Sequence, residues 1–254
     1  MQIGVNLFSI RNLISTPEQC EQTFGTLKDM GVAYVQYSGG PYDVALLQKC
    51  AKILPIVLTN VPMDRILNEP QQLCEEHKSF GCTNIGLGMM PLDIIKDEQK
   101  CKETIAALNE SGKVMQQNGC KLFYHFHHFE FYKFSDGTRI VDYIIDNCPY
   151  VNFTADTYWI QYGGASVTEY LGKMDGRIEC VHLKDYKIVV NDKGEFAPIF
   201  APLSEGNQNY ADIVPVARRC GAKYFLIEQD NAAKTENPMG QIEISVKAAL
   251  GWQF

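Results

Sequence analysis

Three histidines and a glutamate fall within six residues of the stretch LFYHFHHFEF, which spans residues 122–131: His125, His127, His128 and Glu130. Imidazole and carboxylate groups bind divalent transition metals or transfer protons. Successive side chains of an extended strand alternate between two faces, so His125 and His127 are expected on the same face. This pair predicts a functional site, with His128 and Glu130 at its rim. The phenylalanines are predicted to be core residues.

Three later apolar runs also carry acidic or imidazole side chains near their ends. Asp156 ends VNFTAD, His182 lies in ECVHLK, and Glu228 lies in YFLIEQ. Burying an unpaired carboxylate in an apolar strand is costly, which favours a ligand role for Glu228. Asp156 has the alternative of capping the following helix, and His182 that of a satisfied core histidine. A mixed set of nitrogen and oxygen ligands predicts one divalent cation: Mn²⁺, Zn²⁺, Co²⁺ or Fe²⁺, with Mg²⁺ less favoured.

Eight short apolar runs position these side chains. Most lack strict alternation of polar and apolar residues, as expected for parallel strands that are buried on both faces. The predicted strands are residues 3–9, 33–38, 55–60, 84–89, 122–127, 151–156, 179–184 and 224–229.

Helical segments separate the predicted strands. The first is the most clearly marked: Thr16 is a predicted N-cap, Pro17 occupies the first helical position, Gln19 completes a capping box, and Gly31 follows the helix. Pro215 is expected to kink the last of the further helices or to delay its start. The further predicted helices are residues 64–80, 98–118 and 209–220.

Eight strands alternating with helices over about 250 residues are typical of a (β/α)8 TIM barrel. A doubly wound sheet is the main alternative, but it usually has a glycine-rich turn after its first strand, and NLFSIRN has none. We therefore predict one barrel domain over residues 1–254. Functional side chains are expected at the carboxyl ends of its strands.

Composition indicates an ordinary globular protein with 46% hydrophobic residues and a net charge of −7. This acidic balance argues against a nucleic-acid partner. The sequence shows neither a signal peptide nor an apolar run of about 18 residues, so no membrane association is expected. Nine cysteines without any C-x-x-C pair indicate buried free thiols in a reducing compartment, and hence a cytoplasmic protein.

The order and spacing of several motifs resemble those of the sugar phosphate isomerase/epimerase family, which has the xylose isomerase-like TIM-barrel fold. Its relatives include inosose dehydratase and sugar 3-epimerases. The resemblance implies one Mn²⁺ or similar ion bound by His125, Asp156, His182 and Glu228. It covers nearly the whole chain through IGVNLFSIRN, YVQYSGG, YHFHHFEF, DTYW, RIECVHLKDY, PLSEGNQNY and LIEQD.

Three positions depart from the family pattern. His125 stands where epimerases carry a glutamate, which leaves the two-glutamate epimerase scheme open. Gln36 replaces a common glutamate, and Asn60 replaces a common histidine. The last two changes argue against endonuclease IV activity, which needs extra ligands for three zinc ions.

The predicted function is a metal-dependent isomerase or epimerase that removes a proton next to the metal-bound carbonyl of a sugar, keto-sugar or cyclitol. Glu228 or His127 is the predicted base, and Lys184 is predicted to stabilise developing negative charge. A lyase or dehydratase acting on a keto-sugar or 3-keto-glycoside remains an alternative, as does a non-catalytic sugar-binding barrel. The predicted substrate-binding residues are Arg11, Gln36, Asn60, Glu130, Tyr158, Trp159, Asp185 and Glu205.

Several choices stay open at this level. They are the sugar and its phosphorylation, the metal, the formation of a homo-oligomer, and whether His125 or His127 is the ligand from the fifth strand.

Overall fold

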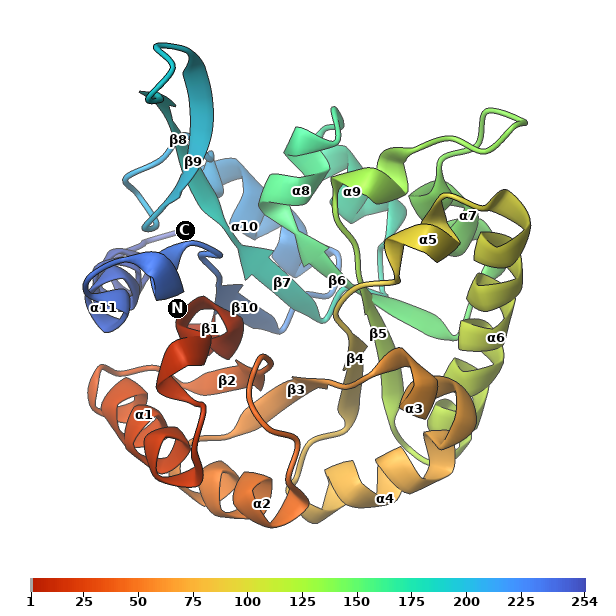
Figure 1. Ribbon diagram of the computed structural model, residues 1–254, viewed down its shortest axis with the longest axis horizontal. Coiled ribbons are helices and arrows are strands. Elements are labelled where there is room, and N and C mark those ends of the chain that lie inside the picture. The colour runs from red at the N-terminus through yellow and green to blue at the C-terminus, as the bar shows by residue number, and fades with distance from the viewer. Residues whose placement is uncertain (1) are drawn as a thin grey trace.

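The computed structural model describes residues 2–254, and eight parallel strands close into a barrel (Figure 1). Around the barrel the strands follow the order β1, β10, β7, β6, β5, β4, β3 and β2. This confirms the predicted (β/α)8 barrel. The strands are β1 Gly4–Asn6, β2 Tyr34–Tyr37, β3 Ile56–Asn60, β4 Asn84–Leu87, β5 Lys121–His125, β6 Val151–Asp156, β7 Cys180–Leu183 and β10 Tyr224–Ile227.

Helices surround this ring of strands, with α1, α2, α4 and α6 on its outside in Figure 1. Three short 3-10 helices lie at strand ends: η1 Leu7–Leu13, η2 His128–Phe131 and η3 Ala232–Lys234. The α-helices are α1 Pro17–Asp29, α2 Val44–Ile53, α3 Met63–Asn68, α4 Pro70–Ser79, α5 Leu92–Ile95, α6 Glu98–Gln117, α7 Ile140–Asn147, α8 Thr157–Tyr162, α9 Val167–Lys173, α10 Tyr210–Arg219 and α11 Pro238–Leu250.

The helices agree with the sequence prediction at some positions and differ from it at others, mainly near prolines. Thr16 caps α1 as predicted, because its side chain accepts a hydrogen bond from the Gln19 backbone N–H. The single helix predicted over 64–80 is wrong: Glu69 has non-helical angles (φ −131°, ψ 37°), since a residue before proline avoids the α region. Pro70 then begins α4. Pro215 lies inside α10, which starts at residue 210 without the predicted delay.

Two strands lie outside the barrel and were not predicted. β8 (Asp185–Val190) and β9 (Phe196–Ala201) pair antiparallel and project from the barrel as a hairpin, at the upper left of Figure 1. The alternation of barrel strands and helices gives no signal for this insertion after β7.

Alternation along the barrel strands explains how the site is positioned. A small apolar cluster of buried strand residues, separate from the main core, consists of Tyr34, Leu58, Phe123, Cys180 and Leu226. Side chains two residues further along a strand point to the same face. The corresponding positions, one step towards the carboxyl ends, are Gln36, Asn60, His125, His182 and Glu228. An apolar layer therefore supports a polar layer directly above it.

Within residues 2–254, no helix has the length and apolar character needed to cross a membrane. All nine cysteines are buried and free, as predicted.

Candidate metal centre

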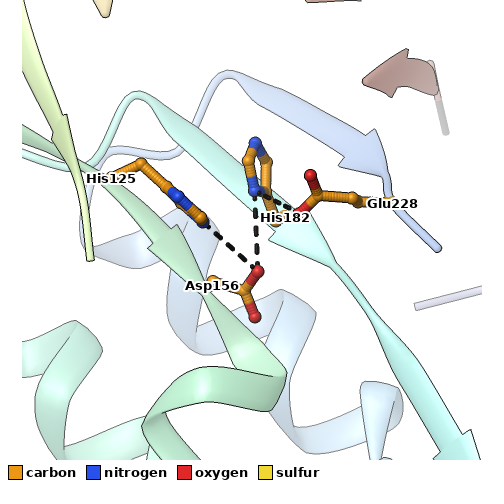
Figure 2. Close-up of side chains that lie close together, drawn as sticks. All are labelled: His125, Asp156, His182 and Glu228. Carbon is orange, nitrogen blue, oxygen red and sulfur yellow. Dashed lines mark hydrogen bonds and ion pairs between the residues drawn. The ribbon is translucent and has the colours of Figure 1, made fainter. Parts of the chain in front are cut away.

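Four side chains from four adjacent strands converge at the carboxyl end of the barrel (Figure 2). His125 ends β5, Asp156 ends β6, His182 lies in β7 and Glu228 follows β10. All four are buried, and one possible ligand atom from each lies within 4.8 Å of the others. His182 Nδ1 is 2.9 Å from Glu228 Oε2 and 3.6 Å from Asp156 Oδ2, while His125 Nε2 is 3.4 Å from Asp156 Oδ2.

Hydrogen bonds orient both imidazole rings of this set. His125 Nδ1 donates to the Gly88 carbonyl at 3.0 Å, which leaves Nε2 directed at Asp156. His182 Nε2 donates to Gln36 Oε1 at 2.6 Å, which leaves Nδ1 directed at the two carboxylates. Metal-binding histidines typically donate their second ring N–H in this way.

In each of the two carboxylates, one oxygen accepts hydrogen bonds from other groups of the protein. Asp156 Oδ1 accepts the backbone N–H groups of Tyr158 and Trp159 at 2.9 and 3.0 Å, so the predicted alternative of helix capping coexists with a ligand position. Asn6 Nδ2 donates to Glu228 Oε1 at 2.7 Å. His182 Nδ1 and Glu228 Oε2 are buried without hydrogen-bond geometry, despite their short separation. Two imidazoles and two carboxylates with free inner atoms fit a divalent cation.

The ammonium of Lys184 lies beside the same two carboxylates. Lys184 Nζ is 2.9 Å from Asp156 Oδ2, 2.8 Å from Glu228 Oε2 and 3.2 Å from Asp230 Oδ1. The side chain is 1% exposed, and its ammonium is 5.0 Å from the centre of the Trp159 ring. Burying this charge requires the carboxylates as partners.

These contacts set the protonation of the charged groups. Burial alone would raise the pKa of Glu228, but the charges of His182 and Lys184 outweigh it and hold the pKa below its usual value. Burial would also raise the pKa of Asp156, yet Lys184 and the two histidines hold it well below its usual value. For His182 burial would lower the pKa, but Glu228 and Asp156 raise it to about 9. Both carboxylates are therefore ionised at neutral pH.

A cavity of about 420 Å³ opens above this centre. Its apolar lining includes Phe8, Val61, Met63, Leu87 and Met89. Its polar and charged lining residues are Asn6, Ser38, Asn60, His125, His127, His182, Lys184, Glu228 and Asp230. The cavity combines an apolar surface with a few convergent polar groups, as small-molecule sites do.

His127 lies next to the centre rather than in it. Its ring centroid is 4.5 Å from that of His125, and its Nδ1 atom is buried without a partner. Burial, with the neighbouring charges of His125 and Lys184, lowers the pKa of His127 to about 2, so the ring is neutral. Glu130 is fully buried below it, accepting the His127 backbone N–H at 2.7 Å and the Tyr124 hydroxyl at 2.8 Å. His128 is exposed at the rim.

The predicted substrate-binding residues fall in different places. Asn60 lines the cavity and accepts a hydrogen bond from Gln36 Nε2 at 3.3 Å. Gln36 is fully buried behind His182 and does not line the cavity. Arg11 donates to the carbonyls of Phe8 and Asp230 at 2.7 and 3.3 Å, close to the cavity mouth.

The remaining four lie beside the cavity or away from it. Trp159 contacts His127 at 5.3 Å between ring centroids, and Tyr158 packs in the adjoining aromatic group. The buried Asp185 carboxylate accepts four backbone N–H groups, which ties down the loop after the hairpin. Glu205 is exposed and pairs with Lys187 at 3.6 Å.

Three polar residues that line the cavity beside the candidate metal centre were not identified from the sequence: Asn6, Ser38 and Asp230. Ser38 Oγ donates to Asn6 Oδ1 at 2.6 Å, which directs the Asn6 amide at Glu228. Asp230 follows Glu228 by two residues in LIEQD, so alternation beyond β10 was the available signal. Asn6 had no such signal, because the strand predicted over 3–9 ends at Asn6 in the structure and residues 7–9 belong to η1.

Comparison with known proteins places this geometry in context. The family model described as xylose isomerase-like TIM barrel matches residues 64–249. No match was found among curated proteins.

Similar solved structures share the barrel at low sequence identity. A sugar phosphate isomerase/epimerase from Parabacteroides distasonis has a TM-score of 0.79 at 18% identity, covering 99% of this chain and 98% of its own. A xylose isomerase-like TIM barrel protein from Mycobacterium smegmatis in complex with magnesium has a TM-score of 0.71 at 16% identity, over 98% and 95%. An L-ribulose 3-epimerase has a TM-score of 0.70 at 16% identity, over 99% and 94%.

Proposed function

Because the chain belongs to the xylose isomerase-like TIM barrel family, we propose that it is a divalent-metal-dependent isomerase or epimerase of a sugar, keto-sugar or cyclitol. The observation that carries this proposal is the convergence of two imidazoles and two carboxylates beside a cavity of about 420 Å³, which His125, His182 and Glu228 line. Such a mixed donor set suits Mn²⁺, Zn²⁺, Co²⁺ or Fe²⁺ and suits Mg²⁺ less well, and the resemblance to the family favours Mn²⁺ among them.

His125, Asp156, His182 and Glu228 would hold the ion. When bound, a divalent ion polarises a carbonyl and stabilises the charge that develops as the neighbouring proton leaves. Gln36 and Gly88 keep the two imidazoles in the required orientation through their hydrogen bonds. The site therefore needs little rearrangement of its ligands.

A base must remove the proton, and three groups that line the cavity are candidates: His127, Glu228 and Asp230. The depressed pKa values of His127 and Glu228 make both weak proton acceptors. Burial and the neighbouring Glu228 charge raise the pKa of Asp230. Asp230 also contacts the Lys184 ammonium at 3.2 Å, which opposes this rise, so the choice of base between Asp230 and His127 is made by experiment.

The other cavity groups orient the substrate. Asn60 offers an amide to sugar hydroxyls, and the neutral His127 ring offers a hydrogen-bonding nitrogen. Phe8 and Met63 also line the cavity, and their apolar surface suits the C–H face of a sugar ring.

The test is proton exchange. The protein is loaded with Mn²⁺ and incubated with a panel of keto-sugars and cyclitols in D₂O, and NMR follows deuterium entering next to the carbonyl. Exchange with an epimeric or isomeric product supports the proposal. Exchange with loss of a leaving group from the next carbon would identify a lyase or dehydratase instead, and no exchange with any substrate would identify a sugar-binding barrel.

Deuterium exchange in two variants identifies which residue is the base. Loss of deuterium exchange in Asp230→Asn, with measurable exchange left in His127→Asn, would assign proton removal to Asp230. The reverse pattern would assign the base to His127.

A cytoplasmic location is part of the proposal. It is supported by the nine buried free thiols, which persist in a reducing compartment.

A further inference from the structure

Lys184 contacts the same carboxylate oxygens that face the two ligand histidines. Asp156 Oδ2 lies 3.4 Å from His125 Nε2 and 2.9 Å from Lys184 Nζ. Glu228 Oε2 lies 2.9 Å from His182 Nδ1 and 2.8 Å from Lys184 Nζ. Each of these two oxygens therefore contacts the ammonium and also faces the candidate metal centre.

We propose that Lys184 and a divalent cation compete for Asp156 and Glu228, and that metal binding transfers the ammonium to Asp230. The inference rests on the metal site of the proposed function. Two positive charges on the same pair of oxygens repel each other strongly in a buried site, where water screens them poorly.

Asp230 is the partner that makes the transfer feasible. Its two oxygens are both 3.2 Å from Lys184 Nζ, so the ammonium already contacts the acceptor that would keep it. Asp230 is not one of the four candidate ligands, and both it and Lys184 line the cavity. Transfer would therefore move a positive charge from the metal ligands towards bound substrate, where it can stabilise developing negative charge.

The aromatic surroundings restrict Lys184 to this path. Its ammonium lies 5.0 Å from the centre of the Trp159 ring and 5.6 Å from that of Phe200. These rings attract a cation but offer no hydrogen-bond acceptor. The carboxylates of Asp156, Glu228 and Asp230 are therefore the ammonium's ionic partners, and loss of the first two leaves the third.

The experiment measures Mn²⁺ affinity by titration calorimetry of the chelator-treated full chain at one pH. Lys184→Met should bind Mn²⁺ about tenfold more tightly than the wild type or better, because the competing charge is gone. The metal-free variant should melt at a lower temperature, since two buried carboxylates lose their counter-ion, and Mn²⁺ should raise its melting temperature more than that of the wild type. Lys187→Met, which removes an exposed lysine of the hairpin, is the matched control and should bind as the wild type does.

Asp230→Asn tests the transfer. It should weaken Mn²⁺ binding severalfold in the wild type but leave it unchanged in the Lys184→Met background, because its effect passes through Lys184. An equal loss in both backgrounds would overturn the transfer. Unchanged or weaker Mn²⁺ binding by folded Lys184→Met would overturn the competition. Lys184→Gln replaces Lys184→Met if the latter does not fold, and the partly exposed Asp230 tolerates its substitution in either case.

These outcomes separate the inference from the proposed function. If the wild type binds Mn²⁺ and Lys184→Met does not bind it more tightly, the competition is absent while the metal-dependent function stands. If only Lys184→Met binds Mn²⁺, the competition stands and Lys184 holds the site against metal in the wild type, so the metal-dependent function fails. If neither binds Mn²⁺, both fail.

Discussion

The two halves of the barrel mouth differ in charge. The ligand half, β5, β6, β7 and β10, carries the imidazoles and carboxylates of the candidate metal centre. The amide half, β1 to β4, carries neutral groups at the same level: Asn6, Gln36, Asn60 and Gly88. Both halves are built alike, from an apolar layer with a polar layer two residues further along the strands.

The difference shows how the two halves divide the chemistry. Amides of the amide half bond candidate ligands of the ligand half: Asn6 bonds Glu228 at the end of the neighbouring strand, and Gln36 bonds His182 on a non-adjacent strand. A second charged set on these strands would either bind further ions or add uncompensated buried charge. Neutral amides hold the candidate ligands in place without altering the charge of the centre.

The largest effect should follow removal of a charge from the ligand half. Asp156→Ala should abolish metal binding and lower turnover by about two orders of magnitude or more, because a bound ion contributes several kcal/mol to such a reaction. Metal content is measured by elemental analysis after loading. Asp156→Asn is the matched control: it keeps an acceptor for the start of α8 and should fold normally while binding metal weakly. Full metal content in Asp156→Ala would contradict the assignment of the metal centre to the ligand half.

A change in the amide half should act through a ligand. Gln36→Leu removes the acceptor for His182 Nε2 and should lower Mn²⁺ affinity about tenfold, in the range found for partners of metal-binding histidines. Titration calorimetry gives the affinity. Gln36→Glu keeps an acceptor at this position and should lose far less. Equal losses in the two variants would show that an acceptor for His182 Nε2 is not what Gln36 contributes to metal affinity.

At the boundary between the two halves, Glu130 should make the free energy of unfolding depend on pH. Burial raises the pKa of Glu130 to about 8, while an exposed glutamate has a pKa of about 4.3. Protonated Glu130 therefore contributes its full stabilisation below a pH of about 4.3, and this contribution is lost as the pH rises through about 8. Between pH 6 and pH 8 the wild type should lose about 2 kcal/mol of unfolding free energy from this group.

Glu130→Gln should not show that loss, because the amide does not ionise. The comparison is urea unfolding of both proteins at pH 6 and pH 8. A parallel pH dependence in the two proteins would contradict the elevated pKa of Glu130.

The smallest effect should follow loss of a cavity amide. Asn60→Ala should raise KM about fivefold, as expected for one neutral hydrogen bond of about 1 kcal/mol, and leave metal content unchanged. Steady-state kinetics on the substrate found by the exchange panel provides KM and kcat. A fall in metal content would show that Asn60 supports the centre through Gln36 instead of contacting substrate.

Much of this site could be predicted from residue types at strand ends. The order of apolar runs and the side-chain alternation place His125, Asp156, His182 and Glu228 at equivalent positions of adjacent strands. The same reasoning misassigned no barrel strand. It missed the β8–β9 hairpin, for which the alternation of strands and helices gives no signal, and it overlooked the break at Glu69, which Pro70 indicates locally. It also treated Gln36 as a candidate substrate contact, and its burial behind His182 follows from barrel closure.

The sequence by itself determined the barrel, the layer of polar residues and the chemical nature of the proposed ligands, since these depend on periodicity and residue type. Only the tertiary structure decided the pairings. Gln36 and His182 are 146 residues apart, and Asn6 and Glu228 are 222 residues apart. Likewise, the position of Lys184 among three carboxylates depends on how β6, β7 and β10 close together. Such contacts arise from the register between strands, which no local pattern contains.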